Sequence, residues 1–254
     1  DVEALGALIR PDTTLVSIMA VNNEIGSIQP IEAISELLAD KPTISFHVDA
    51  VQALAKIPTE KYLTDRVDFA TFSSHKFHGV RGVGFVYIKS GKKITPLLTG
   101  GGQERDYRST TENVAGIAAT AKALRLAMEN LDLFTSKIGQ MKAVIRQALL
   151  DYPDIFVFSD EEDFAPHILT FGIKGVRGEV IVHAFEDYDI FISTTSACSS
   201  KAGKPAGTLI AMGIEKDKAQ SAVRLSLDLE NDMSQVEQFL TKLKLIYNQT
   251  RKVR

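Results

Sequence analysis

The chain has 254 residues, of which 44% are hydrophobic and 24% are charged, and its formal net charge is −3. This length and composition allow a sizeable core in one or two domains, and the mild negative charge predicts no direct binding to nucleic acid or to anionic lipid. No apolar run approaches the roughly 20 residues that cross a bilayer, so we expect no membrane segment. A single cysteine cannot form an internal disulfide, which favours a reducing, cytoplasmic compartment.

Helical and strand-like patterns alternate through the first part of the chain. Helices are predicted at residues 1–10 (ending at Pro11), at residues 31–39 and from residue 50 to residue 56. Apolar runs predict strands at residues 14–21, 43–49, 67–74 and 82–89. Such alternation favours an α/β fold with a largely parallel sheet.

The pattern changes at residues 97–113, a long polar loop that is rich in glycine. Loops of this length often carry function. A long amphipathic helical stretch is predicted at residues 114–150, followed by short apolar runs and a terminal helix near residues 232–250. We therefore predict a larger domain over residues 1–130, with its connecting helix, and a smaller α+β domain over residues 131–254.

Polar side chains follow three of the predicted strands. They are Asn23 after the first strand, Asp49 and Gln52 after the second, and Ser73, His75 and Lys76 after the third. In sheets of this kind, ligands bind at the carboxyl ends of the strands. Each residue alone also has an ordinary explanation: Asn23 as a turn residue, Asp49 as a helix N-cap, and Lys76 as a solvated loop lysine.

Pyridoxal phosphate is the cofactor whose chemical needs this set meets. It requires an amine for its aldehyde, which Lys76 provides, and a carboxylate for its pyridine nitrogen, which Asp49 provides. Gln52 can reach the ring oxygen, and Ser73 and His75 can donate charge-assisted hydrogen bonds to the phosphate.

Six sequence blocks, in order along essentially the whole chain, resemble the cysteine desulfurases, which are fold-type I pyridoxal-phosphate enzymes of the class V aminotransferase group. The blocks are VNNEIGSIQPI, HVDAVQALAK, SSHKFHGVRGVG, GGGQERDYRSTTEN, STTSACSS and VRLSLDLEN. The resemblance implies an aspartate aminotransferase-like fold, with residues 1–130 as the remainder of the cofactor-binding domain and residues 131–254 as the small domain that carries the cysteine loop. It also implies that the chain is truncated and lacks roughly the first third of the family's length.

The resemblance gives a role to each residue singled out above. The implied cofactor ligands are Asn23, Asp49, Gln52, Ser73, His75, Lys76 and Thr111. Lys76 bonds the cofactor covalently, and Asn23 also lies near the substrate carboxylate. Thr111 reaches the phosphate in the neighbouring subunit, which implies a homodimer.

Two further residues carry the sulfur chemistry that the resemblance implies. Arg224 binds the carboxylate of L-cysteine, a task that suits its planar fork, although taken alone it is typical of a surface strand arginine. Cys198 lies among small polar residues near Lys201 and Lys204, a setting that favours the thiolate, whereas a lone cysteine is usually buried and inert. In the family this cysteine receives sulfur as a persulfide and passes it to an acceptor protein, an iron–sulfur scaffold or a tRNA-thiolation protein.

Three functions are compatible with these observations. The first is a cysteine desulfurase, the second is a selenocysteine lyase or another class V aminotransferase-type enzyme, and the third is a non-catalytic dimerisation or partner module. The cysteine loop favours a desulfurase over an aminotransferase, which needs no thiol there. No His, Cys and carboxylate cluster has the spacing of a metal site, and His47 is interpreted as a hydrogen-bonded strand histidine.

Overall fold

A computed structural model describes residues 1–159, 162–195 and 207–252 of the chain. The chain forms two compact units, the first made of Asp1–Ala20 and Gln29–Leu131, the second of Val21–Ile28 and Asp132–Arg254. The sequence did not predict that residues 21–28 belong to the second unit. The functional assignment of residues 1–130 and 131–254 to a cofactor-binding and a small domain stays a prediction.

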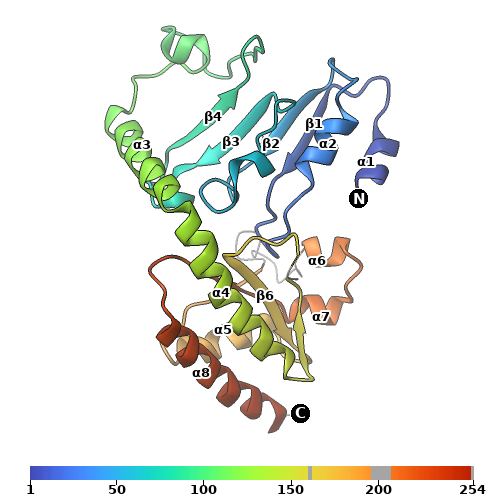
Figure 1. Ribbon diagram of the computed structural model, residues 1–254, viewed down its shortest axis with the longest axis vertical. Helices are drawn as coiled ribbons and strands as arrows, with labels where there is room; N and C mark the ends of the chain where they lie inside the picture. Colours follow the sequence, from blue (N-terminus) through green and yellow to red (C-terminus); the bar gives the residue numbers. More distant parts are fainter. Residues whose placement is uncertain (160–161, 196–206, 253–254) are drawn as a thin grey trace. The chain divides into compact units, whose positions relative to one another are not determined.

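A four-stranded sheet organises the first unit (Figure 1). Its strands are β1 (Leu15–Met19), β2 (Ser45–Asp49), β3 (Phe69–Ser73) and β4 (Gly84–Ile88), which lie side by side in chain order. The first three strands are parallel, and β4 is antiparallel to β3. The predicted α/β class with a largely parallel sheet is confirmed.

One face of this sheet forms the core of the first unit, because alternate residues of a strand point to opposite faces. Phe46 and Val48 of β2 are fully buried, whereas His47 between them is half-buried. Helices α1 (Val2–Leu8) and α2 (Ile31–Leu37) precede β1 and β2, and α2 buries Ile31 and Ile34. The opposite face carries the more polar side chains that the candidate site uses.

The buried carboxylate of Asp68 links strand β2 to the loops that flank the sheet. Asp68 is 2% exposed and accepts hydrogen bonds from the Phe46 backbone N–H (2.9 Å) and from Arg66 Nη1 (2.8 Å), while Lys92 Nζ lies 3.2 Å from its other oxygen. Burial acts to raise the pKa of Asp68, but these donors outweigh it and hold the pKa below its usual value. The guanidinium of Arg66 also donates to three backbone carbonyls, those of Leu38, Lys41 and Ile44.

The predicted helical stretch at residues 114–150 is two helices, α3 (Val114–Glu129) and α4 (Leu131–Leu150), which meet at Asn130. Asn113 caps the start of α3 by accepting a hydrogen bond from the Gly116 N–H at 3.0 Å. Within the described residues, no helix is long and apolar enough to cross a membrane.

The second unit is built around an antiparallel sheet, as expected of an α+β arrangement. Its strands are β5 (Ile155–Val157), β6 (Ile168–Ile173), β8 (Val223–Ser226) and β7 (Ser193–Thr194), in that spatial order. Every residue of β6 is buried. The helices of this unit are α4, α5 (Gly178–Glu186), α6 (Gly207–Ala211), α7 (Lys216–Gln220) and α8 (Met233–Lys252).

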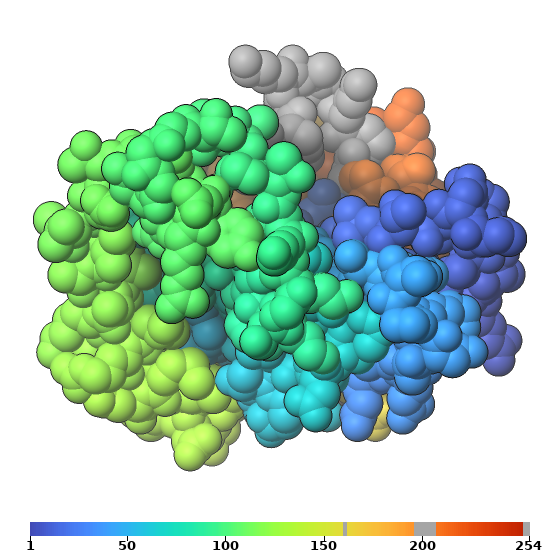
Figure 2. Space-filling model, turned by 90° about the horizontal axis from the view of Figure 1, so that it is seen from above, coloured from blue at the N-terminus to red at the C-terminus, as the bar shows by residue number. Residues whose placement is uncertain are grey.

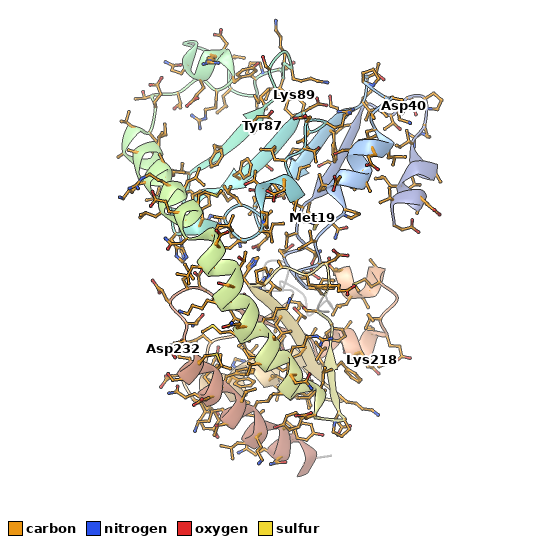
Figure 3. The ribbon with its side chains drawn as sticks, in the orientation of Figure 1. Met19, Asp40, Tyr87, Lys89, Lys218 and Asp232 are labelled. Atoms are coloured by element: carbon orange, nitrogen blue, oxygen red, sulfur yellow. The ribbon has the colours of Figure 1, made fainter. Side chains whose placement is uncertain are left out.

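The core of the second unit lies where α4, α5 and α8 pack on this sheet. Phe185 of α5 stacks on Phe239 of α8 with ring centroids 5.0 Å apart, and Phe171 of β6 meets Phe239 edge-on at 6.2 Å. On the periphery, Lys218 of α7, labelled in Figure 3, lies over the ring of Phe156 at 5.2 Å.

One predicted helix is wrong. Residues 50–56 form successive turns rather than an α-helix, and the short 3₁₀ helix η1 (Thr59–Lys61) follows. Ala55 has φ = 58°, which breaks a right-handed helix, and Pro58 disfavours helical geometry at the residue before it. The Ala- and Leu-rich composition predicted a helix because propensity alone does not register these backbone constraints.

Candidate functional site

Two adjacent parallel strands of the first unit end in residues predicted to bind the cofactor. Asp49 is the last residue of β2 and is paired in register with Thr71 of β3. Ser73, the last residue of β3, lies two residues after Thr71 and projects from the same face of the sheet. Asp49 is exposed, and its Oδ1 accepts a hydrogen bond from the Val51 N–H at 3.0 Å. This bond stabilises a turn after β2. Asp49 therefore holds a turn and does not cap a helix, which was the alternative that the sequence offered.

Lys76 lies in a tight 3₁₀ turn, η2 (Ser74–Phe77), which follows β3 directly. Two hydrogen bonds hold this turn in place. The fully buried Ser74 Oγ lies 2.9 Å from Thr120 Oγ1 of α3, and the Gly79 N–H donates to the Ser74 carbonyl at 2.9 Å. Phe77 is 1% exposed and anchors the turn in the core. The half-buried Lys76 therefore stands on a rigid support.

Close packing explains the glycine that follows this turn. A Cβ atom added at Gly79 would lie 1.8 Å from Ser74 Oγ and 3.0 Å from the Ser74 carbonyl oxygen. The residue before it, His78, has φ = 65° and ends the turn in the left-handed conformation. No role for Ser74, Thr120 or Gly79 follows from the sequence, because the hydroxyl pair that links η2 to α3 has no local sequence signal.

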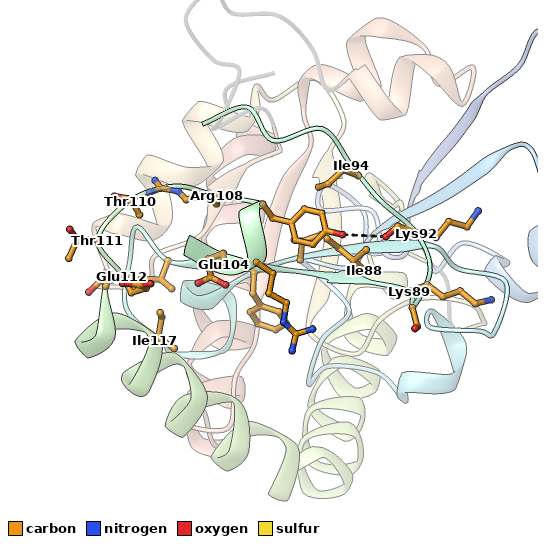
Figure 4. Close-up of a pocket in the computed structure, with 18 of the residues that line it drawn as sticks. Ile88, Lys89, Lys92, Ile94, Glu104, Arg108, Thr110, Thr111, Glu112 and Ile117 are labelled. Carbon is orange, nitrogen blue, oxygen red and sulfur yellow. Dashed lines mark hydrogen bonds between the residues drawn. The ribbon is translucent and has the colours of Figure 1, made fainter. Parts of the chain in front are cut away.

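The other predicted cofactor ligands of the first unit differ in exposure. Gln52 is half-buried in the turns after β2, and His75 is exposed beside Lys76. Thr111 is exposed and, with Thr110, Glu112 and Arg108, lines a pocket of about 1050 Å³ between β4 and the loop that leads to α3 (Figure 4).

The loop that encloses this pocket forms a surface of the first unit. Figure 2 shows this green segment around residue 100 lying beside the yellow-green α3. The Tyr107 hydroxyl donates to the Lys92 carbonyl at 3.4 Å and joins the two ends of the loop, as the dashed line in Figure 4 marks. Asp49 and Lys76 are not among the residues that line this pocket.

The two residues predicted to bind substrate meet in the second unit. Arg224, on β8, donates from Nη1 to the backbone carbonyl of Asn23 at 2.8 Å, although the two are 201 residues apart in sequence. Arg224 is half-buried, which does not fit a plain surface arginine. The turn at this point is stabilised by Asn22, whose Oδ1 accepts from the N–H groups of Glu24 (2.8 Å) and Ile25 (3.0 Å).

Further hydrogen bonds hold residues 22–25 in place within the second unit. Thr170 Oγ1 of β6 donates to the Glu24 carbonyl at 2.6 Å, and the Glu24 carboxylate accepts from the Thr208 N–H of α6 at 3.2 Å. Asn22 Nδ2 donates to Thr208 Oγ1 at 3.3 Å. The roles of Glu24 and Thr208 do not follow from the sequence alone. Cys198 lies outside the described residues.

The donor set of the first unit fits pyridoxal phosphate in its chemistry. A carboxylate (Asp49), a hydroxyl (Ser73) and an amine (Lys76) occur together at the ends of β2 and β3, on supports that their own hydrogen bonds fix. Lys76 is half-buried. A lysine used for covalent chemistry needs to be buried only in part. Among residues 1–159, 162–195 and 207–252, no three His, Cys, Asp or Glu side chains are grouped as a metal ion would require.

Comparison with known sequences places these residues in a family context. A family model described as Aminotransferase class-V matches residues 1–239. A NifS/IcsS protein homolog from Lactobacillus delbrueckii subsp. bulgaricus is 51% identical over 99% of this chain, and a protein named cysteine desulfurase IscS from Clostridium botulinum is 38% identical over 99% of it. The chain spans 66% and 64% of the lengths of these two relatives.

Solved structures share the fold. A NifS-like protein superposes with a TM-score of 0.88 at 37% identity, covering 98% of this chain and 65% of that one. A NifS-like protein from Rickettsia africae superposes with a TM-score of 0.86 at 30% identity, covering 98% of this chain and 66% of that one. The fold of the chain is thus one that known proteins adopt.

Proposed function

The chain belongs to the aminotransferase class-V family, and we propose that it acts as a pyridoxal-phosphate-dependent cysteine desulfurase. The proposed reaction converts L-cysteine to L-alanine and leaves the sulfur as a persulfide on Cys198. The observation that carries the proposal is the placement of Asp49, Ser73 and Lys76 at the ends of two adjacent parallel strands. Names of similar proteins, a cysteine desulfurase among them, support the same reaction.

When bound, the cofactor supplies an electron sink for the bonds at the substrate's α-carbon. In this account Lys76 provides the amine that holds the cofactor covalently, and its rigid turn limits where that amine can lie. Asp49 keeps a negative charge beside the pyridine nitrogen. Ser73 and His75 donate hydrogen bonds to the phosphate, and Gln52 to the ring oxygen. The residues at the carboxyl ends of β2 and β3 therefore supply most of the proposed contacts to the cofactor.

The second unit contributes the substrate contacts. Arg224 binds the carboxylate of L-cysteine, and its bond to the Asn23 carbonyl fixes one side of the guanidinium so that its remaining donors have a defined direction. Orientation of the substrate is a large part of catalysis in such reactions, since it decides which bond is activated. Asn23 is proposed to contact both the ring oxygen and the substrate.

The remaining assignments of the proposal concern partners. Cys198 receives the sulfur and delivers it to an acceptor protein, either an iron–sulfur scaffold or a tRNA-thiolation protein, in the cytoplasm. Thr111 is exposed on the loop before α3, which leaves it accessible to a second copy of the chain. The active form is accordingly proposed to be a homodimer in which Thr111 of one subunit contacts the phosphate bound by the other.

The visible spectrum of the chain mixed with pyridoxal phosphate tests the cofactor assignment. We expect an absorption band from lysine-bound cofactor that Lys76→Ala abolishes and that Lys61→Ala, a change at an exposed lysine of η1, leaves intact. A band that persists in Lys76→Ala contradicts the assignment. Absence of the band in the unaltered chain contradicts the proposal that this chain binds the cofactor by itself.

Product analysis tests the reaction. We expect alanine from L-cysteine in the unaltered chain, and bound cofactor without alanine in Cys198→Ser. Alanine and sulfide at unchanged rates in Cys198→Ser contradict the role of the thiol. Turnover of selenocysteine with no turnover of cysteine identifies a selenocysteine lyase instead.

A further inference from the structure

A row of three polar side chains crosses the open face of the sheet in the first unit. The Ser17 hydroxyl on β1 lies 2.7 Å from His47 Nδ1, and His47 Nε2 on β2 lies 3.1 Å from the Thr71 hydroxyl on β3. Both ring nitrogens of His47 therefore have a hydrogen-bonding partner. A hydroxyl can donate or accept, so this arrangement satisfies either tautomer of the neutral ring and fixes its orientation.

This row lies next to the carboxylate proposed to serve the cofactor. His47 and Asp49 are two residues apart on β2, so their side chains project from the same face of the sheet. Thr71, which bonds the ring of His47, is the residue paired in register with Asp49 on β3. The ring is thus held beside Asp49 by partners on both neighbouring strands.

The charge state of the ring follows from its surroundings. Burial lowers the pKa of His47 from its usual value, and the negative charge of Asp49 opposes this only in part, so the ring is neutral near pH 7. Asp49 is the one ionisable group among the described residues that the strand register places around His47 on this face; the others are Leu15, Ser17, Met19, Ser45, Phe69 and Thr71. A neutral ring forms no ion pair with Asp49.

We propose that His47 is a positioning residue that acts through Asp49: held by Ser17 and Thr71, it restricts the Asp49 carboxylate to the position that faces the pyridine nitrogen. This inference rests on the proposed function, which gives Asp49 its role. It adds a residue that the site assignment above leaves out, and it explains why a histidine rather than an apolar residue occupies the middle of an exposed sheet face.

Substitutions at His47 separate positioning from mere support of the sheet. Removal of supporting groups around a ligand typically costs 10- to 100-fold in function, so we expect His47→Ala to lower kcat about tenfold. The KM for cysteine stays within about twofold, because an interaction that acts through the cofactor site does not contribute to substrate binding. His47→Gln places an amide near the Nε2 position and is expected to recover part of the loss.

The matched control is Ser45→Ala, which alters the same face of the same strand two residues earlier. We expect it to leave kcat unchanged. A His47→Ala chain with normal kcat and a lowered urea midpoint overturns the proposal, because His47 then only supports the sheet.

A measurement on the cofactor-free chain tests directly whether His47 and Asp49 interact. The ¹⁵N NMR titration of the imidazole in the apo chain, assigned with His47→Gln, is expected to give a midpoint below that of a free histidine. Asp49→Asn is expected to lower this midpoint further, since it removes the negative charge that favours the protonated ring. Glu60→Gln, at an exposed carboxylate of η1, serves as the control and leaves the midpoint unchanged.

The two proposals fail in different ways. A His47 midpoint that Asp49→Asn does not move overturns the inference, whatever the chain does with cofactor. A coupled His47 midpoint in a chain that forms no Lys76-bound cofactor supports the His47–Asp49 interaction and contradicts the proposed function.

Discussion

The two sheets of the molecule place their candidate residues in different ways. In the parallel sheet of the first unit, Asp49 and Ser73 are the terminal residues of neighbouring strands, and Lys76 follows within one turn. In the antiparallel sheet of the second unit, Arg224 lies inside β8 and is fixed by Asn23, a residue from the distant N-terminal part of the chain. The first arrangement depends on strand topology, the second on long-range hydrogen bonds.

The candidate residues of the two units therefore depend on different contacts. The strand ends of the first unit depend on the stability of their sheet, in which Asp68 and its donors occupy a central place. The substrate contact of the second unit depends on a few hydrogen bonds to residues 22–25. Substitutions in the first set are therefore expected to change stability, and substitutions in the second set to change substrate affinity.

The largest expected effect is on stability, from Asp68→Asn. Breaking a buried ion pair leaves charged partners uncompensated, and we expect the free energy of unfolding in urea to fall by about 3 kcal/mol. Asp65→Asn, at an exposed carboxylate three residues earlier, is the control and is expected to change it by less than about 0.5 kcal/mol. Equal effects of the two substitutions contradict a special role for the buried pair.

The same carboxylate predicts a pH dependence. The pKa of Asp68 is lowered in the folded chain, so its stabilising contribution is present above the unfolded pKa of about 3.9 and is lost as the pH falls through the folded value. We expect the difference in unfolding free energy between the unaltered chain and Asp68→Asn to shrink on acidification below about pH 4. A difference that stays constant through this range contradicts the assignment.

The next effect is on substrate binding, from Arg224→Lys. A lysine keeps the charge but loses the planar fork, and a lost charge-assisted hydrogen bond of about 1.5–3 kcal/mol raises KM for cysteine by about 10- to 100-fold. The band of bound cofactor is expected to stay unchanged, and the free energy of unfolding to fall by no more than about 1 kcal/mol, from the loss of the hydrogen bond to the Asn23 carbonyl. Arg177→Lys, at an exposed arginine of the same unit, is the control. An unchanged KM in Arg224→Lys removes Arg224 from the substrate site.

A smaller effect is expected from Gly79→Ala, which places a methyl group against Ser74 behind the Lys76 turn. Overpacking of this kind costs about 2 kcal/mol, and the displaced turn is expected to weaken the cofactor band as well. Gly139→Ala offers the opposite case, because no atom lies within 4 Å of the added Cβ. It lies within α4 and is expected to stabilise the chain by about 0.5–1 kcal/mol through helix propensity.

The smallest effect is expected from Thr170→Val, which removes the hydroxyl that donates to the Glu24 carbonyl. The loss of one hydrogen bond costs about 1 kcal/mol, measured as the free energy of unfolding, and we also expect a modest rise in KM for cysteine. Thr241→Val makes the same change on the exposed side of α8 and serves as the control for the substitution itself.

Sequence patterns predicted the parts of the fold and site that arise from local order. The four strands of the first unit were predicted within two residues at each end from their apolar residues, and the largely parallel sheet was predicted from the alternation of strand and helix patterns. The prediction that polar residues gather at strand ends was sound for Asp49 and Ser73, which end β2 and β3.

The remaining features depend on backbone geometry and on long-range contacts. The helix predicted at residues 50–56 is absent because Ala55 adopts a positive φ, which no residue type in that stretch signals. The contact between Arg224 and Asn23 joins residues 201 positions apart, and the transfer of residues 21–28 to the second unit has no sequence signature. His47 was predicted to be a hydrogen-bonded strand residue, and its bonds to Ser17 and Thr71 confirm this.

The proposed function depends most directly on Lys76, in the turn after β3, as the residue that bonds the cofactor. Borohydride reduction of the chain with pyridoxal phosphate makes such a bond permanent, and mass spectrometry of the peptides then locates it. We expect the cofactor's mass on the peptide that contains Lys76 and on no other in stoichiometric amount. Stoichiometric labelling of a different lysine, with Lys76 unmodified, would contradict it.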